Sequence, residues 1–305
     1  MTTDAATPPS PVVLVGVDGS EPGLQATRWA AREARRRRAR LRLVHVVMGF
    51  DESWLTDPKI GRGYRDALLG MARARLAAAR RAALAAAPGA DVEERLSAGD
   101  PAQRLTEESG AAQLVVLGDR GLGGFSGLLL GSVAVAVTQH TDCPVVVTRG
   151  PAPGETLPGA DAPVVVGVDG SPLSEAALAF AFEAAALRGV PLVAVHAWWD
   201  ILVDPGAAPF LDLASADARE QEVLAERLAG WGEKYPDVPV RRVVVPDRPA
   251  RALVSRSHDA GLVVVGSRGR GGFTGLLLGS VSHALLHHAA CPVAVVRPRA
   301  AGASR

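Results

Sequence analysis

Residues 118–133 read GDRGLGGFSGLLLGSV, and residues 266–281 read GSRGRGGFTGLLLGSV. The two stretches are identical at 13 of 16 positions. Each is rich in glycine and follows a short apolar run, which is typical of a turn from a strand toward a helix. Because glycine adopts positive φ and lets the backbone approach a ligand, the repeat predicts a phosphate-loop-like unit that is present twice.

The duplication extends through both halves of the chain. PVVLVGVDGS at residues 11–20 returns as PVVVGVDGS at residues 163–171, and Cys-Pro-Val at residues 143–145 returns at residues 291–293. Between the copies, residues 150–163 are rich in Pro, Gly and Ala and lack an apolar period, which is typical of a linker. We therefore expect two domains, at residues 11–150 and 163–298.

Composition narrows the class of protein. A net charge of +1 over 305 residues gives no electrostatic reason to expect nucleic acid or a membrane surface as a partner, and the arginine cluster at residues 35–40 is interpreted as a solvated helix end. Residues 271–296 are uncharged, but their glycines, histidines and internal Pro292 favour a loop and a buried helix over a membrane span. The N-terminus has neither a basic start nor an apolar run, so we expect no signal peptide and a cytoplasmic location.

Hydrophobic patterning predicts alternating strands and helices in each half. The strands of the first half are expected at residues 12–17, 41–47, 92–97, 114–117 and 145–148, and its helices at residues 21–38, about 64–86, 101–111 and 131–140. The strands of the second half are expected at residues 164–168, 192–195, 240–245, 262–265 and 293–296. Five strands joined by helices predict a parallel sheet with helices on both faces in each half.

The polar and glycine motifs fall where such sheets bind ligands. The ligand crevice of an open α/β sheet lies outside the carboxyl ends of the strands, where the strand order reverses. Asp18-Gly19-Ser20 follows the first strand, and the glycine loop that begins at Gly118 follows the fourth. That loop leads into Gly131-Ser132 at the start of a helix, where free backbone N–H groups favour an anion.

Two common nucleotide motifs do not fit. A P-loop needs Gly-Lys before Ser or Thr, and the only lysines, Lys59 and Lys234, do not follow glycine. A dinucleotide fingerprint needs three spaced glycines directly after the first strand, where this chain has GVDGS. The pattern that fits is G-x2-G-x9-G-[ST], which occurs in both halves, at Gly118, Gly121, Gly131 and Ser132 and at Gly266, Gly269, Gly279 and Ser280.

With VGVDGS opening each half and Val-His near the end of each second strand, the chain closely resembles a tandem universal stress protein of the ATP-binding type. The resemblance covers almost the whole chain apart from the tails and the linker. It implies an α/β fold of two tandem copies of a five-stranded parallel-sheet α/β/α sandwich, Rossmann-like and similar to the adenine nucleotide alpha hydrolases. It also implies an ATP-binding protein that acts in stress response or signalling.

The resemblance further implies roles for single residues. In that family the glycine loop and the following Ser or Thr hold the phosphates and ribose, the first-strand Asp lies near the nucleotide and its divalent metal, and the backbone at the end of the second strand meets adenine. Carried over, these roles fall to Gly118, Gly121, Gly131, Ser132, Asp18 and Val46, and in the second half to Gly266, Gly269, Gly279, Ser280, Asp169 and Ala197. The implied cofactors are ATP and Mg²⁺, with Asp18 and Asp169 beside the metal. Arg120 and Arg268 are expected to contact phosphate, because a guanidinium can bind two oxygens at once.

Several features have a second interpretation. Asp18 and Asp169 could simply cap helices. The strand histidines, His45 and His196, are expected to be core residues with their hydrogen bonds satisfied. Asp119, where the second copy has Ser267, would place a carboxylate beside the phosphates and repel them unless a metal or Arg120 offsets its charge, so we expect the first site to be the weaker one. The aromatics after the second strands, Phe50, Trp54, Trp198, Trp199 and Phe210, could cover the crevice or pack a loop.

We expect nucleotide binding without robust catalysis, since the strand ends carry no catalytic set beyond one Asp per half. The alternatives are a slow Mg²⁺-dependent ATPase, in which Asp18 or Asp169 positions water through the metal, and a dimerisation scaffold that binds no nucleotide. The last strand of each half is short and apolar, and the resemblance implies that it lies at a sheet edge, which invites pairing. We therefore predict that residues 145–148 pair with residues 293–296 inside one chain, so that any further homodimer must use helices or loops.

Overall fold

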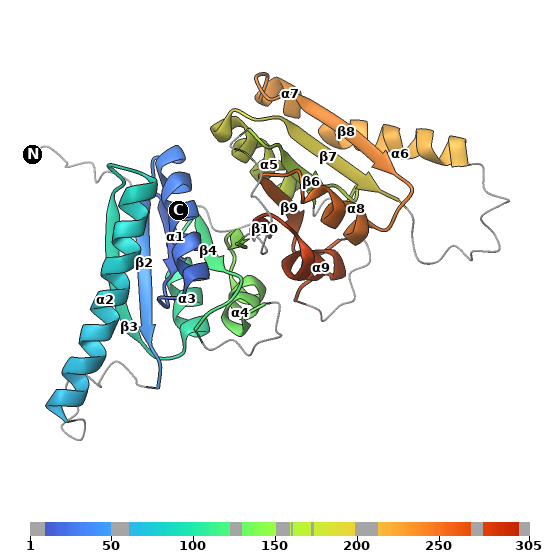
Figure 1. The fold of residues 1–305 in the computed structure, drawn as a ribbon. Coiled ribbons are helices and arrows are strands. Elements are labelled where there is room, and N and C mark those ends of the chain that lie inside the picture. Colours follow the sequence, from blue (N-terminus) through green and yellow to red (C-terminus); the bar gives the residue numbers. More distant parts are fainter. Residues whose placement is uncertain are drawn as a thin grey trace, which may run out of the picture.

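The computed structural model describes residues 10–49, 61–122, 130–150, 159, 161–171, 174–198, 213–269 and 277–298. In this part of the chain, strands and helices alternate (Figure 1). The strands are β1 (Val12–Gly16), β2 (Arg40–Val47), β3 (Val92–Ala98), β4 (Leu114–Gly118), β5 (Val145–Thr148), β6 (Val164–Gly167), β7 (Leu192–Ala197), β8 (Val240–Val245), β9 (Leu262–Gly266) and β10 (Val293–Val296). The helices are α1 (Glu21–Arg36), α2 (Arg62–Ala86), α3 (Pro101–Ser109), α4 (Ser132–His140), α5 (Glu175–Arg188), α6 (Leu213–Leu228), α7 (Trp231–Lys234), α8 (Pro249–Arg256) and α9 (Ser280–His288). All the predicted strands are present.

Local sequence explains where the helices begin. Ser20 is the N-cap of α1, because its hydroxyl accepts a hydrogen bond from the N–H of Gly23 at 3.1 Å. Asp100 caps α3 in the same way through the N–H of Gln103. A proline stands in the first turn of both helices, where it costs no hydrogen bond. These caps end the preceding strands at fixed points and so place the turns at the carboxyl edge of the sheet.

The strands form one ten-stranded sheet in the order β3-β2-β1-β4-β5-β10-β9-β6-β7-β8. All pairs within a half are parallel, as predicted, and each half repeats the same order. The strand order reverses between β1 and β4, and again between β6 and β9. In open α/β sheets, ligands bind outside the carboxyl ends of the strands at such reversals.

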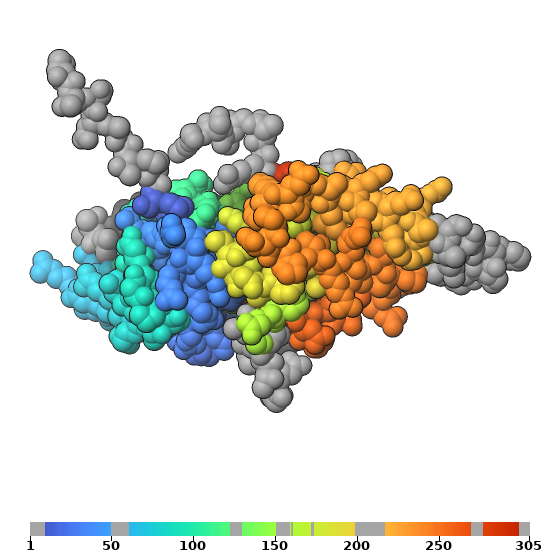
Figure 2. Space-filling view, turned by 90° about the horizontal axis from the view of Figure 1, so that it is seen from above, coloured from blue at the N-terminus to red at the C-terminus, as the bar shows by residue number. Residues whose placement is uncertain are grey.

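The two halves are joined by the last strand of each copy. β5 pairs with β10 antiparallel, with Val146 opposite Ala294, which confirms the predicted pairing. In Figures 1 and 2 the first half, blue to green, lies directly against the second half, yellow to red. Two apolar cores, one on each face of the sheet, both contain residues of the two copies. The domains thus share one sheet and one pair of cores.

On one face, each half completes a helix of the other. Arg149, directly after β5, donates a hydrogen bond to the carbonyl of Leu286 near the end of α9 at 2.9 Å. Arg297, directly after β10, donates to the carbonyl of Gln139 near the end of α4. The last carbonyls of a helix lack partners within it and carry partial negative charge, so a guanidinium there is stabilising. This exchange follows the pseudo-twofold relation of the copies.

On the other face, the halves exchange cation–π contacts and an ion pair. The guanidinium of Arg37 lies 5.1 Å from the ring centre of Phe180, and that of Arg188 lies 5.5 Å from the ring of Trp29. Arg188 also reaches Glu33 of the first half at 2.7 Å. The side chain of Arg37 is 4% exposed, so the interpretation of residues 35–40 as a solvated helix end is wrong for Arg37, which belongs to the junction between the halves.

No helix in the ranges described combines the length and the apolar character that a bilayer span requires. Within residues 271–296, the described part contains α9, whose Leu285 and Leu286 are buried in the core. Pro292 precedes β10. Residues 271–276 lie outside the described part of the chain.

Both cysteines are reduced and buried, and burial raises the pKa of the Cys291 thiol to about 12. Since the thiolate is the reactive form, we expect neither thiol of the native protein to react at neutral pH with a soluble aromatic disulfide. The same assay in denaturant should release both thiols. Fast reaction of one thiol in the folded protein would contradict the packing around Cys143 and Cys291.

Candidate functional site

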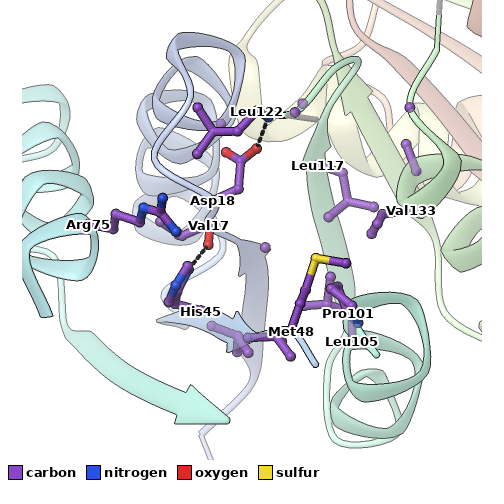
Figure 3. Close-up of a pocket in the computed structure, with 18 of the residues that line it drawn as sticks. Val17, Asp18, His45, Met48, Arg75, Pro101, Leu105, Leu117, Leu122 and Val133 are labelled. Atoms are coloured by element: carbon purple, nitrogen blue, oxygen red, sulfur yellow. Dashed lines mark hydrogen bonds between the residues drawn. The ribbon is translucent and has the colours of Figure 1, made fainter. Parts of the chain in front are cut away.

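A cavity of about 820 Å³ opens at the carboxyl ends of β1, β2 and β4, where the strand order reverses. This volume is within the range of small-molecule sites. Figure 3 shows Asp18, His45 and Arg75 on one side of it and Leu117 and Val133 on the other. All the first-half residues predicted to bind the nucleotide line this one cavity: Asp18, Val46, Gly118, Arg120, Gly121, Gly131 and Ser132.

Asp18 ties together the turns that follow β1 and β4. Its Oδ1 accepts hydrogen bonds from the N–H and the hydroxyl of Ser20, at 2.9 and 2.7 Å, and its Oδ2 accepts the N–H of Leu122 at 2.8 Å. The helix N-cap is Ser20, so the alternative that Asp18 itself caps α1 is wrong. Asp18 instead positions the cap and the start of the glycine loop.

Two glycines of the loop stand where a side chain has no room. A Cβ on Gly118 would lie 2.8 Å from the carbonyl carbon of Pro22, because the start of α1 packs directly on the end of β4. A Cβ on Gly121 would lie 2.6 Å from Oδ2 of Asp18. The close approach to backbone requires glycine at position 118, whereas a side chain at position 121 would displace the carboxylate of Asp18.

The loop returns to the sheet at the N-terminus of α4. The N–H of Gly131 donates to the carbonyl of Asp119 at 2.7 Å, which fixes the entry into the helix. Gly131 is the N-cap and has no side chain to bond the first N–H groups of α4. Those groups, next to Ser132 and Arg120 on the cavity wall, form a site suited to phosphate oxygens.

A magnesium ion fits this site only together with a ligand that supplies oxygens. Asp18 is the predicted metal residue, and within the described chain no three His, Cys, Asp or Glu side chains come together as a metal site. Mg²⁺ in nucleotide sites is commonly held by one or two carboxylates, water and substrate phosphates. One carboxylate beside a phosphate-binding helix start agrees with that donor set.

The second half repeats the turn geometry. Asp169 accepts hydrogen bonds from the N–H and hydroxyl of Ser171, at 2.9 and 2.7 Å, and a Cβ on Gly269 would lie 2.7 Å from Oδ2 of Asp169. The N–H of Gly279 donates to the carbonyl of Ser267 at 2.7 Å. The remaining predicted residues follow the same plan, with Ala197 ending β7, Gly266 ending β9, Arg268 in the loop and Ser280 opening α9.

The strand histidines both bind the first turn of their own half. The Nδ1 of His45 lies 2.6 Å from the carbonyl of Val17, and the Nδ1 of His196 lies 2.6 Å from that of Val168. Both histidines are buried, which confirms the prediction of core residues. Since a carbonyl only accepts, Nδ1 carries the proton. Burial lowers the pKa of His45. The ring of His45 is also part of the cavity wall.

Asp119 does not face the cavity. Its side chain is 3% exposed and lies 3.5 Å from Nε of Arg120 and 3.6 Å from Nε of Arg149. Burial raises the pKa of its carboxyl group. The cavity lining found in the described residues does not include it. The carboxylate therefore lies beside Arg120, the cation expected to offset its charge, and beside Arg149 at the junction of the halves. The lower affinity of the first site stays a prediction.

The sequence did not identify the wall that α2 contributes. Leu68, Met71, Ala72 and Arg75 line the cavity from this helix. Their spacing could have indicated that these four residues lie on one face of the helix. It could not have indicated that this face lines a cavity. Of the aromatics that were expected to cover or pack a loop, Phe50, Trp54, Trp199 and Phe210 lie outside the described residues.

Comparison with known proteins matches both halves to one family. The model of the universal stress protein family matches residues 11–149 and 162–297. A universal stress protein of Mycobacterium tuberculosis is 44% identical over 296 residues, which cover 93% of this chain and 96% of the relative. The crystal structure of a universal stress protein from Archaeoglobus fulgidus has a TM-score of 0.64 at 21% identity and covers 95% of this chain and 99% of its own. A universal stress protein solved in complex with cAMP is 31% identical, with a TM-score of 0.36, and covers 45% of this chain and 96% of its own.

Proposed function

Because the chain belongs to the universal stress protein family, we propose that it binds an adenine nucleotide, ATP, in each half and acts in stress response or signalling. One observation carries the proposal. Residues from four separate segments, predicted from the sequence as nucleotide contacts, line a single cavity of suitable size in the first half. The equivalent turns of the second half have the same hydrogen bonds.

The chemistry of the walls supports a nucleotide. The N-terminus of α4 and the guanidinium of Arg120 provide hydrogen-bond donors and positive charge for phosphate. The cavity is also lined by Met48, Leu68 and Leu105, whose apolar side chains suit a base. Val46, near the end of β2, also lines the cavity, and we expect its backbone groups to meet the edge of adenine.

Binding is favoured over hydrolysis by the state of Asp18. Both of its carboxylate oxygens already accept hydrogen bonds, from Ser20 and Leu122, so its role is to hold the loop rather than to remove a proton from water. Mg²⁺, when bound with the nucleotide, would neutralise phosphate charge beside this carboxylate. A cytoplasmic location is part of the proposal, since ATP and magnesium are available there.

Calorimetry with ATP and Mg²⁺ tests the proposal. We expect one nucleotide bound per half of the chain, because both motif copies are complete. A parallel assay of phosphate release separates a binder from a slow ATPase. Absence of heat with ATP, together with no nucleotide released from freshly purified and denatured protein, would leave the scaffold alternative.

A further inference from the structure

The two halves differ at the wall that α2 and α6 contribute. His45 and His196 occupy the same place in their halves, and the Nδ1 of each lies 2.6 Å from a backbone carbonyl. The other nitrogen of each ring has different surroundings. In the second half, Nε2 of His196 lies 2.7 Å from Oε2 of Glu220 on α6. In the first half, His45 lines the cavity.

The helix register shows what replaces Glu220 in the first half. Leu76 of α2 and Leu224 of α6 are both buried in the same core and occupy equivalent positions. One helical turn before them stand Ala72 and Glu220. Ala72 lines the cavity. The wall beside the histidine is thus a methyl group in the first half and a carboxylate in the second.

A cation stands on the same wall in the first half only. Arg75, one residue before Leu76, lines the cavity and lies beside Asp18 and His45 (Figure 3). Its Cγ is 2.9 Å from the position a Cβ of Gly19 would occupy, so the absence of a side chain there lets the arginine fold over the first turn. Within the ranges that the structure describes, its guanidinium has no hydrogen-bond or ion-pair partner.

The second half has no counterpart of this cation at the same position. The residue directly before Leu224 is Val223. In the second half, Nε2 of His196 and the carboxyl group of Glu220 share a proton, so this pair carries no net charge. The two equivalent walls therefore differ by the positive charge of Arg75 in the first half. Charges near a partly buried site act on a ligand more strongly than they would in bulk water.

We propose that the two halves are unequal nucleotide sites, in which the cation of Arg75 makes the first half select the phosphate charge of ATP, while Val223 stands at the same helix position in the second half. This inference rests on the proposed function. The first site is then the one that binds ATP more tightly. This order is the reverse of the one expected from Asp119, whose carboxylate faces Arg149 rather than the cavity. Arg75 is a specificity-determining residue of the first half.

The test measures each half separately with two probes, ATP with Mg²⁺ and adenosine. Gly269→Ala leaves the first site for study, and Gly121→Ala leaves the second. In the Gly269→Ala chain, Arg75→Met should weaken ATP binding about tenfold, the size of one favourable contact between charges. It should leave adenosine binding unchanged, because adenosine carries no phosphate. Arg75→Lys should restore most of the preference for ATP.

The second site gives the reciprocal experiment. In the Gly121→Ala chain, Glu220→Gln should leave the affinities for ATP and adenosine nearly unchanged, since the carboxyl group and His196 form a pair without net charge. The matched controls lie on the same helices at exposed positions, Arg73→Met on α2 and Glu222→Gln on α6. Neither control should change the affinity for ATP. Added salt should narrow the difference between the sites.

The outcomes separate this inference from the function on which it rests. If neither half binds ATP or adenosine, the proposed function fails. If both halves bind ATP equally, or if Arg75→Met weakens ATP and adenosine by the same factor, nucleotide binding stands and the inequality of the sites is overturned. If a glycine variant does not fold, the affinities come from a two-site fit to the unchanged chain, and Arg75→Met must then shift one of them alone.

Discussion

Gly121→Ala is expected to abolish nucleotide binding by the first half while the chain stays folded. The new Cβ would lie 2.6 Å from Oδ2 of Asp18, closer than the two atoms can approach. Asp18 must then move, which breaks its bond to the N–H of Leu122 and displaces the start of the glycine loop. Losing the donors to a charged phosphate costs about 1.5–3 kcal/mol per bond, so two lost contacts lower the affinity by about a hundredfold or more.

Gly269→Ala is expected to do the same to the second half, since its Cβ would lie 2.7 Å from Oδ2 of Asp169. Calorimetry should show one site lost in each single variant and both lost in the double variant. The matched controls are Gly70→Ala on α2 and Gly232→Ala on α7, where no atom lies within 4 Å of the added Cβ. A folded double variant that still binds ATP normally would show that the loop is not the site.

Glu33→Ala is expected to destabilise the folded chain by about 3–5 kcal/mol, the cost of breaking a buried ion pair. The side chain of Glu33 is fully buried, and its carboxylate lies 2.7 Å from both Arg37 and Arg188. Those two arginines are 4% and 8% exposed. Without Glu33, Arg188 loses the carboxylate that it contacts across the junction, and Arg37 keeps only Glu183. Unfolding in denaturant, followed by circular dichroism, measures the change.

The control for this measurement is an ion pair of the same length on the surface. Glu21 and Arg28 are also 2.7 Å apart, but their side chains are 61% and 39% exposed. Exposed pairs contribute about 0–1 kcal/mol because water screens them. Glu21→Ala should therefore change stability far less than Glu33→Ala. Equal effects of the two substitutions would mean that the network at the junction does not hold the halves together.

The strands and the loop could be predicted from the sequence because their signals are local. Apolar β-branched runs such as residues 145–148 and 293–296 mark buried strands wherever they occur, and the repeated glycine spacing marks both turns. The pairing of β5 with β10 also followed, since a short apolar strand at a sheet edge needs a partner.

The features that the sequence did not disclose depend on partners far away in the chain. Glu33 resembles any helix glutamate until Arg188, from the second copy, reaches it. Arg37 belongs to a basic run, and only the fold buries it. Asp119 turned toward Arg149 rather than toward the cavity, and Arg75 depended on how α2 is rotated over Gly19. Side-chain direction at such positions is set by packing between elements, which no local pattern contains.

The order of the strands also bears on aggregation. With β5 and β10 joined at the centre, the outer strands of the described sheet are β3 and β8. β3 exposes Glu94 and Arg95, and β8 exposes Arg241 and Arg242. Charged side chains on an edge strand oppose the addition of a further strand. The charged outer strands of the described sheet therefore disfavour the pairing of a further strand at either end.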